Sequence, residues 1–256
     1  MSSSASPLST GNDLSGRKAL VTGASRGIGA AIALALAARG AHVAITYENS
    51  EGPAQALVRE IQAMGRTAVA LQANSADAGA AESSVKAAAE ALGGLNILVN
   101  NAGIARGGPL ETMSVEDIDA LIGVNIRGVI LTTRAAIPLL SDGGRIINIG
   151  SCLAERVAMP GISVYSMTKS ALVALTKGLS RDLGPRGITV NVVQPGSTDT
   201  DMNPADGPGS ADQLSGMSLK HYGTGEDIAG MVVFLAAPTG RQITGARFTV
   251  DGGANA

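Results

Sequence analysis

The sequence predicts a single-domain α/β protein in which a doubly wound, seven-stranded parallel sheet is flanked by helices on both faces. Short apolar, β-branched runs alternate with Ala- and Leu-rich segments along the 256 residues. The runs are almost continuously apolar, as in ILV at 97–99, which suits strands buried on both faces. No internal repeat or Pro/Gly-rich linker divides the chain, so we expect one domain over residues 14–256.

Seven apolar runs predict the strands. In chain order they occupy residues 18–22, 41–46, 67–71, 95–99, 145–149, 188–193 and 247–250. Segments such as 29–39, 53–64 and 80–91 are long enough to be the crossover helices. Ligands bind such sheets beyond the carboxyl ends of the strands, so the residues that follow each strand are the first candidates for a site.

Two polar segments are predicted to lie outside the regular elements. Residues 1–13 have no positive charge and no apolar run, so we interpret them as a disordered tail rather than a signal or transit peptide. The Pro-, Gly- and Ser-rich stretch at 203–218 is too near the C-terminus to divide domains. We expect it to be a mobile loop within a substrate loop at about 199–222.

Composition argues against several classes of function. A net charge of −2 and an aromatic content of 2% predict no nucleic-acid partner. Uncharged apolar stretches such as 228–240 are shorter than the roughly 18 residues of a membrane-spanning helix, so we expect no membrane partner. Two histidines and a single cysteine predict no metal site and no intramolecular disulfide, which fits a cytoplasmic protein.

A glycine-rich segment, TGASRGIG, follows the first predicted strand. Gly23, Gly27 and Gly29 would let the backbone turn tightly and approach a pyrophosphate, whose charge the following helix N-terminus stabilises. The alternative is a plain glycine-rich turn between a strand and a helix. Short motifs of this kind match by chance often enough that the segment alone does not decide between the two.

Tyr165 and Lys169 form a second signal. A spacing of four residues places both side chains on one helix face. There the lysine ammonium would stabilise a phenolate and lower the tyrosine pKa from about 10, giving an acid or base usable near neutral pH. The alternative is an ordinary pair on a helix surface.

With these motifs in place, the chain resembles the short-chain dehydrogenase/reductase family over nearly its whole length, in the family's motif order. The matching segments are TGASRGIG (22–29), LVNNAG (98–103), VNIRG (124–128), Ser151, the Tyr165/Lys169 pair, Pro195-Gly196 and VDGG (250–253). The resemblance implies a Rossmann fold and a nicotinamide-dependent oxidoreductase. It also implies a homotetramer built through long helices such as residues 163–183.

The resemblance implies a catalytic tetrad of Asn125, Ser151, Tyr165 and Lys169. Ser151 would hold a substrate carbonyl oxygen to which Tyr165 gives a proton as hydride arrives from the nicotinamide. Lys169 would lower the Tyr165 pKa and bind the nicotinamide ribose, while Asn125 would anchor a water in the proton relay. Taken singly, Asn125 could instead be a helix-distorting polar residue, and Ser151 a cap at a strand end.

The resemblance also supplies cofactor-binding positions. These are Gly23, Ser25, Arg26, Gly27, Ile28, Gly29, Tyr47, Asn74, Ser75, Asn101, Ala102, Gly103, Tyr165, Lys169, Pro195, Gly196, Thr198 and Thr200. Asn74-Ser75 stand where many relatives carry an acidic residue at the adenine. Tyr47 stands where NAD-specific relatives carry an aspartate on the ribose.

We therefore expect NADPH or NADP rather than NAD as the cofactor. Arg26 lies within the glycine-rich turn, where a guanidinium can hold a 2′-phosphate with paired hydrogen bonds. The gain would be about 1–3 kcal/mol after desolvation. A solvated arginine is the alternative, and Glu48 would oppose the phosphate unless it points to solvent.

Apolar residues near the tetrad suggest a hydrophobic carbonyl substrate. They are Cys152, Leu153, Met159, Pro160, Gly161 and Met202. We interpret Cys152 as a pocket residue rather than a redox sensor, because no activating cation is evident.

The leading prediction of function is NADPH-dependent, reversible reduction of a ketone to a secondary alcohol. The first alternative is 3-oxoacyl-thioester reduction, which usually needs a basic surface for an acyl carrier that the sequence does not locate. The second is a regulator on the same fold, because QPGSTDTDMNPADGP (194–208) is similar to a biofilm-dispersal branch of the family associated with cyclic-di-GMP.

Overall fold

The computed structural model describes residues 13–256, so the predicted tail at 1–13 lies outside the described residues except for Asp13. Asp13 forms an ion pair with Arg39, with 2.7 Å between Oδ2 and Nη2. Because a carboxylate and a guanidinium fix each other's position in such a pair, Asp13 is held against the rest of the described chain.

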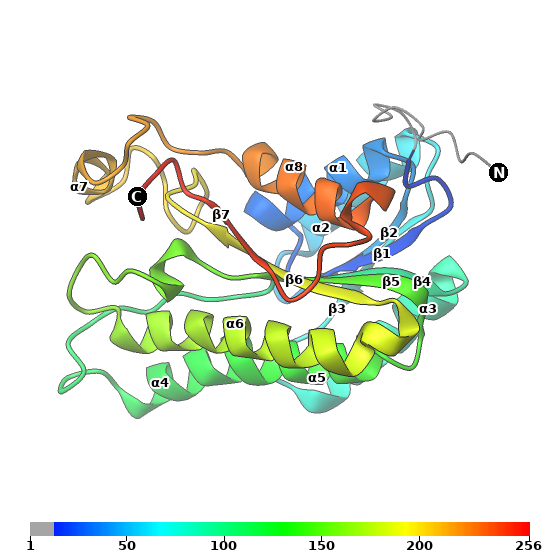
Figure 1. The fold of residues 1–256 in the computed structure, drawn as a ribbon, viewed down its shortest axis with the longest axis horizontal. Coiled ribbons are helices and arrows are strands. Elements are labelled where there is room, and N and C mark those ends of the chain that lie inside the picture. Colours follow the sequence, from blue (N-terminus) through cyan, green and yellow to red (C-terminus); the bar gives the residue numbers. More distant parts are fainter. Residues whose placement is uncertain (1–12) are drawn as a thin grey trace.

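A seven-stranded, wholly parallel sheet forms the centre of the molecule (Figure 1), which confirms the predicted fold class. The strand order is β3-β2-β1-β4-β5-β6-β7, so the chain first winds to one side of β1 and then to the other. The strands are β1 (Lys18–Val21), β2 (His42–Tyr47), β3 (Ala68–Gln72), β4 (Leu95–Asn100), β5 (Leu140–Ile149), β6 (Thr189–Pro195) and β7 (Arg247–Val250).

The predicted strand boundaries hold within one or two residues except at β5. This strand begins at Leu140, five residues before the predicted start, because Leu140 pairs with Leu95 ahead of a register shift. Polar Ser141 and Asp142 interrupt the apolar run there, which is why the pattern did not reveal the extension.

Helices cover both faces of the sheet (Figure 1). One layer consists of α1 (Gly27–Ala38), α2 (Glu51–Ala63) and α8 (Gly225–Ala236). The other consists of α3 (Ala78–Leu92), α4 (Val115–Ile122), α5 (Val129–Ala136) and α6 (Ser163–Leu183). Each layer packs on fully buried aliphatic side chains such as Ile32 and Val85, which is the packing expected of strands that are apolar on both faces.

Two segments depart from a simple helix or loop. A π-helix, η1 (Gly123–Gly128), joins α4 to α5 and contains Asn125. The predicted mobile loop at 203–218 contains a short helix, α7 (Ser210–Ser215), entered through Gly209 with a φ of 81°. None of the described helices is both long and apolar enough to cross a membrane.

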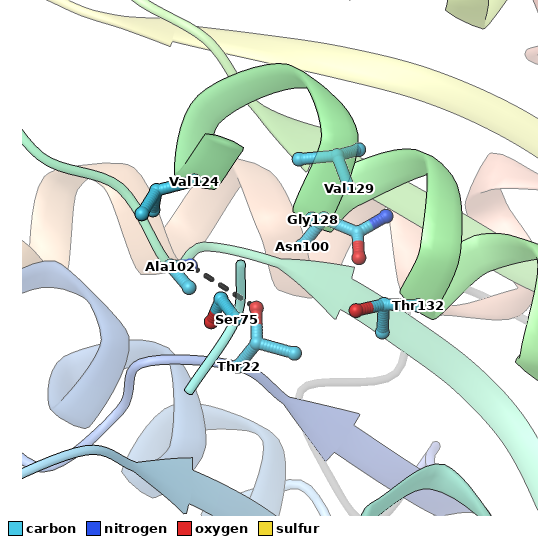
Figure 2. A pocket seen from close by; sticks show the side chains of 8 residues that line it. All are labelled: Thr22, Ser75, Asn100, Ala102, Val124, Gly128, Val129 and Thr132. Carbon is cyan, nitrogen blue, oxygen red and sulfur yellow. Dashed lines mark hydrogen bonds between the residues drawn. The ribbon is translucent and has the colours of Figure 1, made fainter. Parts of the chain in front are cut away.

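The winding direction reverses between β1 and β4, and Thr22 joins their ends. Its Oγ1 accepts hydrogen bonds from the backbone amides of Asn101 and Ala102, each at 3.0 Å. Figure 2 shows this contact beside a small space between Ser75 and Thr132 that leaves no room for a water molecule. The two strand ends are therefore fixed at the place where ligands of doubly wound sheets bind.

Candidate active site

A cleft of about 1210 Å³ opens beyond the carboxyl ends of β1, β4, β5 and β6. This volume exceeds that of ordinary small-ligand pockets, which span about 300–1,000 Å³, so a dinucleotide and a substrate fit together. The predicted site residues that line the cleft are Gly23, Ser25, Arg26, Gly27, Ile28, Gly29, Tyr47, Ser75, Asn101, Ala102, Gly103, Ser151, Cys152, Leu153, Met159, Tyr165, Lys169, Pro195, Gly196, Thr198, Thr200 and Met202.

Four predicted site residues lie outside this lining, and one of them, Pro160, is exposed. Asn74 is exposed, because its Oδ1 turns back to accept a hydrogen bond from the Ala76 amide at 2.8 Å. The Gly161 carbonyl accepts a hydrogen bond from the Gly108 amide at 2.7 Å, so this glycine joins two loops instead of facing the cavity. Asn125 lies behind the cleft wall and is 1% exposed.

The glycine-rich turn is packed too closely to be a plain connection. Gly23 has a φ of +60°, and a Cβ there would lie 2.7 Å from the Ala102 Cα. A Cβ at Gly29 would lie 2.5 Å from the Asn101 Nδ2. The backbone around these glycines leads into the N-terminus of α1, where free amides and the helix dipole favour an anion. The turn therefore fits the pyrophosphate of a dinucleotide.

Ser151 lies at the end of β5 and has two partners. Its Oγ accepts a hydrogen bond from the Leu153 amide at 3.2 Å, so it does cap a 3₁₀ turn, as the simpler interpretation expected. The same hydroxyl also influences the Tyr165 phenol, acting to lower the phenol pKa. The cap fixes the serine rotamer that faces the tyrosine.

Tyr165 and Lys169 are not a surface pair. Lys169 is 6% exposed, and its Nζ donates a hydrogen bond to the Ile149 carbonyl at 3.1 Å. Burial lowers the pKa of Lys169 from 10.5 to about 8. Burial likewise raises the pKa of Tyr165 above its ordinary value, outweighing the lowering influence of Ser151.

The Tyr165 pKa corrects one expectation, namely that it would lie below 10, because desolvation of the phenol raises it. The lysine Nζ lies 5.9 Å from the tyrosine ring centroid and is engaged by the Ile149 carbonyl. Desolvation of the phenol is therefore the largest influence on the Tyr165 pKa. It raises that pKa and keeps Tyr165 protonated at neutral pH.

Asn125 uses its whole side-chain amide to brace the cleft wall. Its Oδ1 accepts from the Ile104 amide and its Nδ2 donates to the Ile104 carbonyl, both at 2.9 Å. Nδ2 also donates to Thr168 Oγ1 at 3.1 Å, which links η1 to α6. The alternative of a helix-distorting residue is thus partly right, since Asn125 lies within the π-helix.

The same π-helix supports the opposite end of the cleft. Arg127 Nη1 donates a hydrogen bond to the Ala76 carbonyl at 2.6 Å. A Cβ at Gly128 would lie 2.5 Å from the Ser75 carbonyl oxygen, so this glycine permits close packing of the loop that carries Ser75 (Figure 2). One irregular helical turn therefore holds both the Ser75 loop and Asn125.

Arg26, which is predicted to bind the 2′-phosphate, forms an ion pair that the sequence did not reveal. Its Nη1 lies 3.2 Å from Asp201 Oδ2, and the two side chains are 65% and 72% exposed. Tyr47 ends β2 on the cleft wall and is 7% exposed, and Glu48 follows it in the lining.

At the other end of the cleft, the apolar lining includes Cys152, Met159 and Met202. Burial raises the pKa of the Cys152 thiol to about 11. Sequence reasoning missed Arg156 and Asn255, which also line this end. Arg156 Nη1 donates to the Ala254 carbonyl and Asn255 Nδ2 donates to the Cys152 carbonyl, both at 2.8 Å, so the last residues close the pocket.

A doubly wound parallel sheet with a glycine-rich turn and a Ser-Tyr-Lys cluster lining the cleft at its switch point defines a dinucleotide-dependent oxidoreductase. The chain belongs to the short-chain dehydrogenase/reductase family. The family model described as "Enoyl-(Acyl carrier protein) reductase" matches residues 23–255.

Three relatives illustrate this membership. A short-chain dehydrogenase from Burkholderia cenocepacia J2315, solved in complex with NADP, is 57% identical, with a TM-score of 0.94 over 95% of this chain and 100% of that one. The cyclic-di-GMP-binding biofilm dispersal mediator protein of Escherichia coli is 43% identical over 93% of this chain and 96% of its own. A 3-oxoacyl-[acyl-carrier-protein] reductase of Synechocystis is 43% identical over 94% and 97%.

Proposed function

We propose that this oxidoreductase reduces a ketone to a secondary alcohol with NADPH, reversibly, and that Tyr165 supplies the proton. The observation that carries the proposal is the position of Tyr165 in the lining of the dinucleotide-sized cleft, where Ser151 also lines the cavity and the phenol is protonated at neutral pH. A proton donor beside a hydroxyl that can hold a carbonyl oxygen is what polarisation of a ketone requires.

Each member of the tetrad has a distinct part in this proposal. Ser151 donates a hydrogen bond to the substrate oxygen, and Tyr165 transfers a proton to it. Lys169, positively charged below a pKa of about 8, stabilises the phenolate left on Tyr165 and contacts the nicotinamide ribose. Asn125 is a positioning residue, since its amide is fully used in holding Ile104 and Thr168.

The nicotinamide supplies hydride to the carbonyl carbon when it is bound. Of the residues that line the cleft, the Gly23 turn and the α1 N-terminus would hold the pyrophosphate, Ser75 would face the adenine, and Arg26 would contact the 2′-phosphate. Tyr47 at the end of β2 carries no charge to repel that phosphate. The NADP complex of the Burkholderia relative supports the same assignment.

The substrate end of the cleft favours an aliphatic carbonyl compound. Its apolar lining consists of aliphatic or sulfur-containing side chains such as Cys152, Leu153, Met159 and Met202. The test is to mix purified protein with NADPH or NADH and a panel of aliphatic and aromatic ketones, following the loss of near-ultraviolet absorbance. Absence of turnover with both cofactors would overturn the proposed function.

A second candidate is reduction of a 3-oxoacyl thioester, favoured by the Synechocystis relative. The chemistry at Tyr165 would be the same, because such a thioester is also a ketone. Including a 3-oxoacyl thioester in the panel decides between the two by the ratio of kcat/KM values.

A regulatory role in binding cyclic-di-GMP rests on the 194–208 segment and on the E. coli relative. Titration with that nucleotide in the presence and absence of NADPH separates a regulator from an enzyme, because a pure regulator binds the nucleotide and turns over no ketone.

We also propose that the protein is a cytoplasmic homotetramer. Exposed apolar side chains on the outer helices support association, for example Ile130 on α5 at 43% exposure and Met167 on α6 at 49%. Light scattering at micromolar concentration tests the assembly, and a monomer would overturn it.

A further inference from the structure

The loop that follows β6 places a carboxylate against the residue assigned to the 2′-phosphate. Asp201 Oδ2 lies 3.2 Å from Arg26 Nη1, although 175 residues separate them in the chain. We infer that Asp201 is a cofactor-specificity residue that competes with the 2′-phosphate of NADPH for Arg26. The inference rests on the proposed function, in which NADPH is the cofactor. It identifies Asp201 as a residue that weakens NADPH binding.

The position of Asp201 is built into the loop. Thr200 and Asn203 pair as an antiparallel bridge, with the Asn203 amide donating to the Thr200 carbonyl at 3.0 Å. Asp201 and Met202 therefore lie at the tip of a tight turn. Asn203 in turn exchanges two side-chain hydrogen bonds with Gln213, at 3.0 and 3.1 Å, which ties the turn to α7.

The turn also lies directly over the phosphate-binding glycines. A Cβ at Gly27 would lie 3.4 Å from the Thr200 Cγ2, so the Thr200 side chain packs against the glycine at the start of α1. Arg26 is the N-cap residue of that helix, and its side chain makes no capping hydrogen bond. Its guanidinium is therefore available both to Asp201 above it and to a phosphate in the cleft.

Competition between the Asp201 carboxylate and the 2′-phosphate for Arg26 should weaken the binding of NADPH and leave that of NADH unchanged. NADPH must displace Asp201 from Arg26 or accept a carboxylate beside its 2′-phosphate, and both cost affinity. NADH has only a ribose hydroxyl there and gains nothing from freeing Arg26. Both side chains are mostly exposed, and exposed ion pairs contribute at most about 1 kcal/mol, which is about 5-fold in affinity.

The test is a double-mutant cycle on the full-length protein, with NADPH and NADH dissociation constants measured by calorimetry. We expect Asp201→Asn to bind NADPH about 2- to 5-fold more tightly and NADH unchanged. Asp206→Asn removes an equal charge from an exposed position in the same loop and is the matched control. In the Arg26→Ala background, Asp201→Asn should have no more effect on NADPH than Asp206→Asn.

The outcomes separate this inference from the proposed function. If the native protein binds neither NADPH nor NADH, the proposed function fails. If it binds NADPH but Asp201→Asn and Asp206→Asn behave alike, the competition is wrong while the function stands. An equal gain for NADPH and NADH would mean that Asp201 acts on the loop rather than on the 2′-phosphate, which also overturns the inference.

Discussion

The ammonium nitrogen of Lys169 lies 5.9 Å from the centre of the Tyr165 ring, and both groups are withdrawn from water. Burial moves their pKa values in opposite directions, lowering that of Lys169 to about 8 and raising that of Tyr165. Below pH 8 the pair is therefore a cation beside a neutral phenol, which is the state that carbonyl reduction needs. Above pH 8 the cation is lost first.

We therefore expect kcat/KM for reduction to fall as the pH rises through about 8. The sign follows from Lys169: its neutral form cannot stabilise the phenolate that Tyr165 becomes on giving up its proton. Lys169→Arg keeps its charge at all accessible pH values, so its residual activity should lack the fall near pH 8. A flat native profile from pH 7 to about 9 would contradict this role.

Replacing Tyr165 with Phe should lower turnover by about 10² to 10⁴, because the change removes the proton donor and keeps the ring. The hydroxyl is influenced by Ser151, which lies away from the phosphate-binding turn, so the NADPH dissociation constant should stay close to the native value. Stopped-flow reduction and calorimetry measure the two quantities separately. A variant that retains more than half of the native kcat would remove Tyr165 from the mechanism.

Cys152 should be a slow nucleophile despite its place beside Ser151. Its thiol is 7% exposed, and burial and the nearby Asp251 carboxylate raise its pKa to about 11, so little thiolate exists at neutral pH. We expect alkylation by iodoacetamide at pH 7 to be much slower than that of the urea-unfolded chain, as measured by mass spectrometry. Equal rates would revive the redox-sensor interpretation.

Local patterns account for what the sequence predicted well. The strands follow from apolar runs, and the Tyr165/Lys169 pair follows from a spacing of four on one helix. Contacts between distant segments have no such signature. Arg26 meets Asp201 across 175 residues, and Arg156 meets Ala254 across 98, so the loop contact and the closure of the pocket by the C-terminal residues were both missed.

The Tyr165 pKa was mispredicted for a related reason. Sequence shows which charge can approach a group but not how much water the folded chain removes from it. Here desolvation exceeds the influence of the Ser151 hydrogen bond, and the Ile149 carbonyl, 20 residues from Lys169, engages the ammonium. Asn125 illustrates the same limit, since its partners Ile104 and Thr168 come from two other segments.

Gly23 should tolerate alanine much less well than Gly65, although both have a positive φ. Gly23 has a φ of +60° and would place a Cβ 2.7 Å from the Ala102 backbone, whereas Gly65 has a φ of +76° and no atom within 4 Å of the added carbon. Gly65→Ala therefore bears only the left-handed backbone cost of about 1–2 kcal/mol. Gly23→Ala adds overpacking of about 1–3 kcal/mol, for a loss of about 2–5 kcal/mol in the free energy of unfolding.

Urea unfolding of the two alanine variants and the native protein measures this difference through the midpoints, provided the slopes agree. NADPH affinity gives an independent measurement. The added Cβ at position 23 would push Ala102 away and widen the turn that the pyrophosphate must enter. We expect Gly65→Ala to bind NADPH with native affinity and Gly23→Ala to bind it at least tenfold more weakly, a change of about 1.4 kcal/mol. Equal midpoints together with equal NADPH affinities would show that the close approach of Gly23 to Ala102 has no part in holding the cofactor.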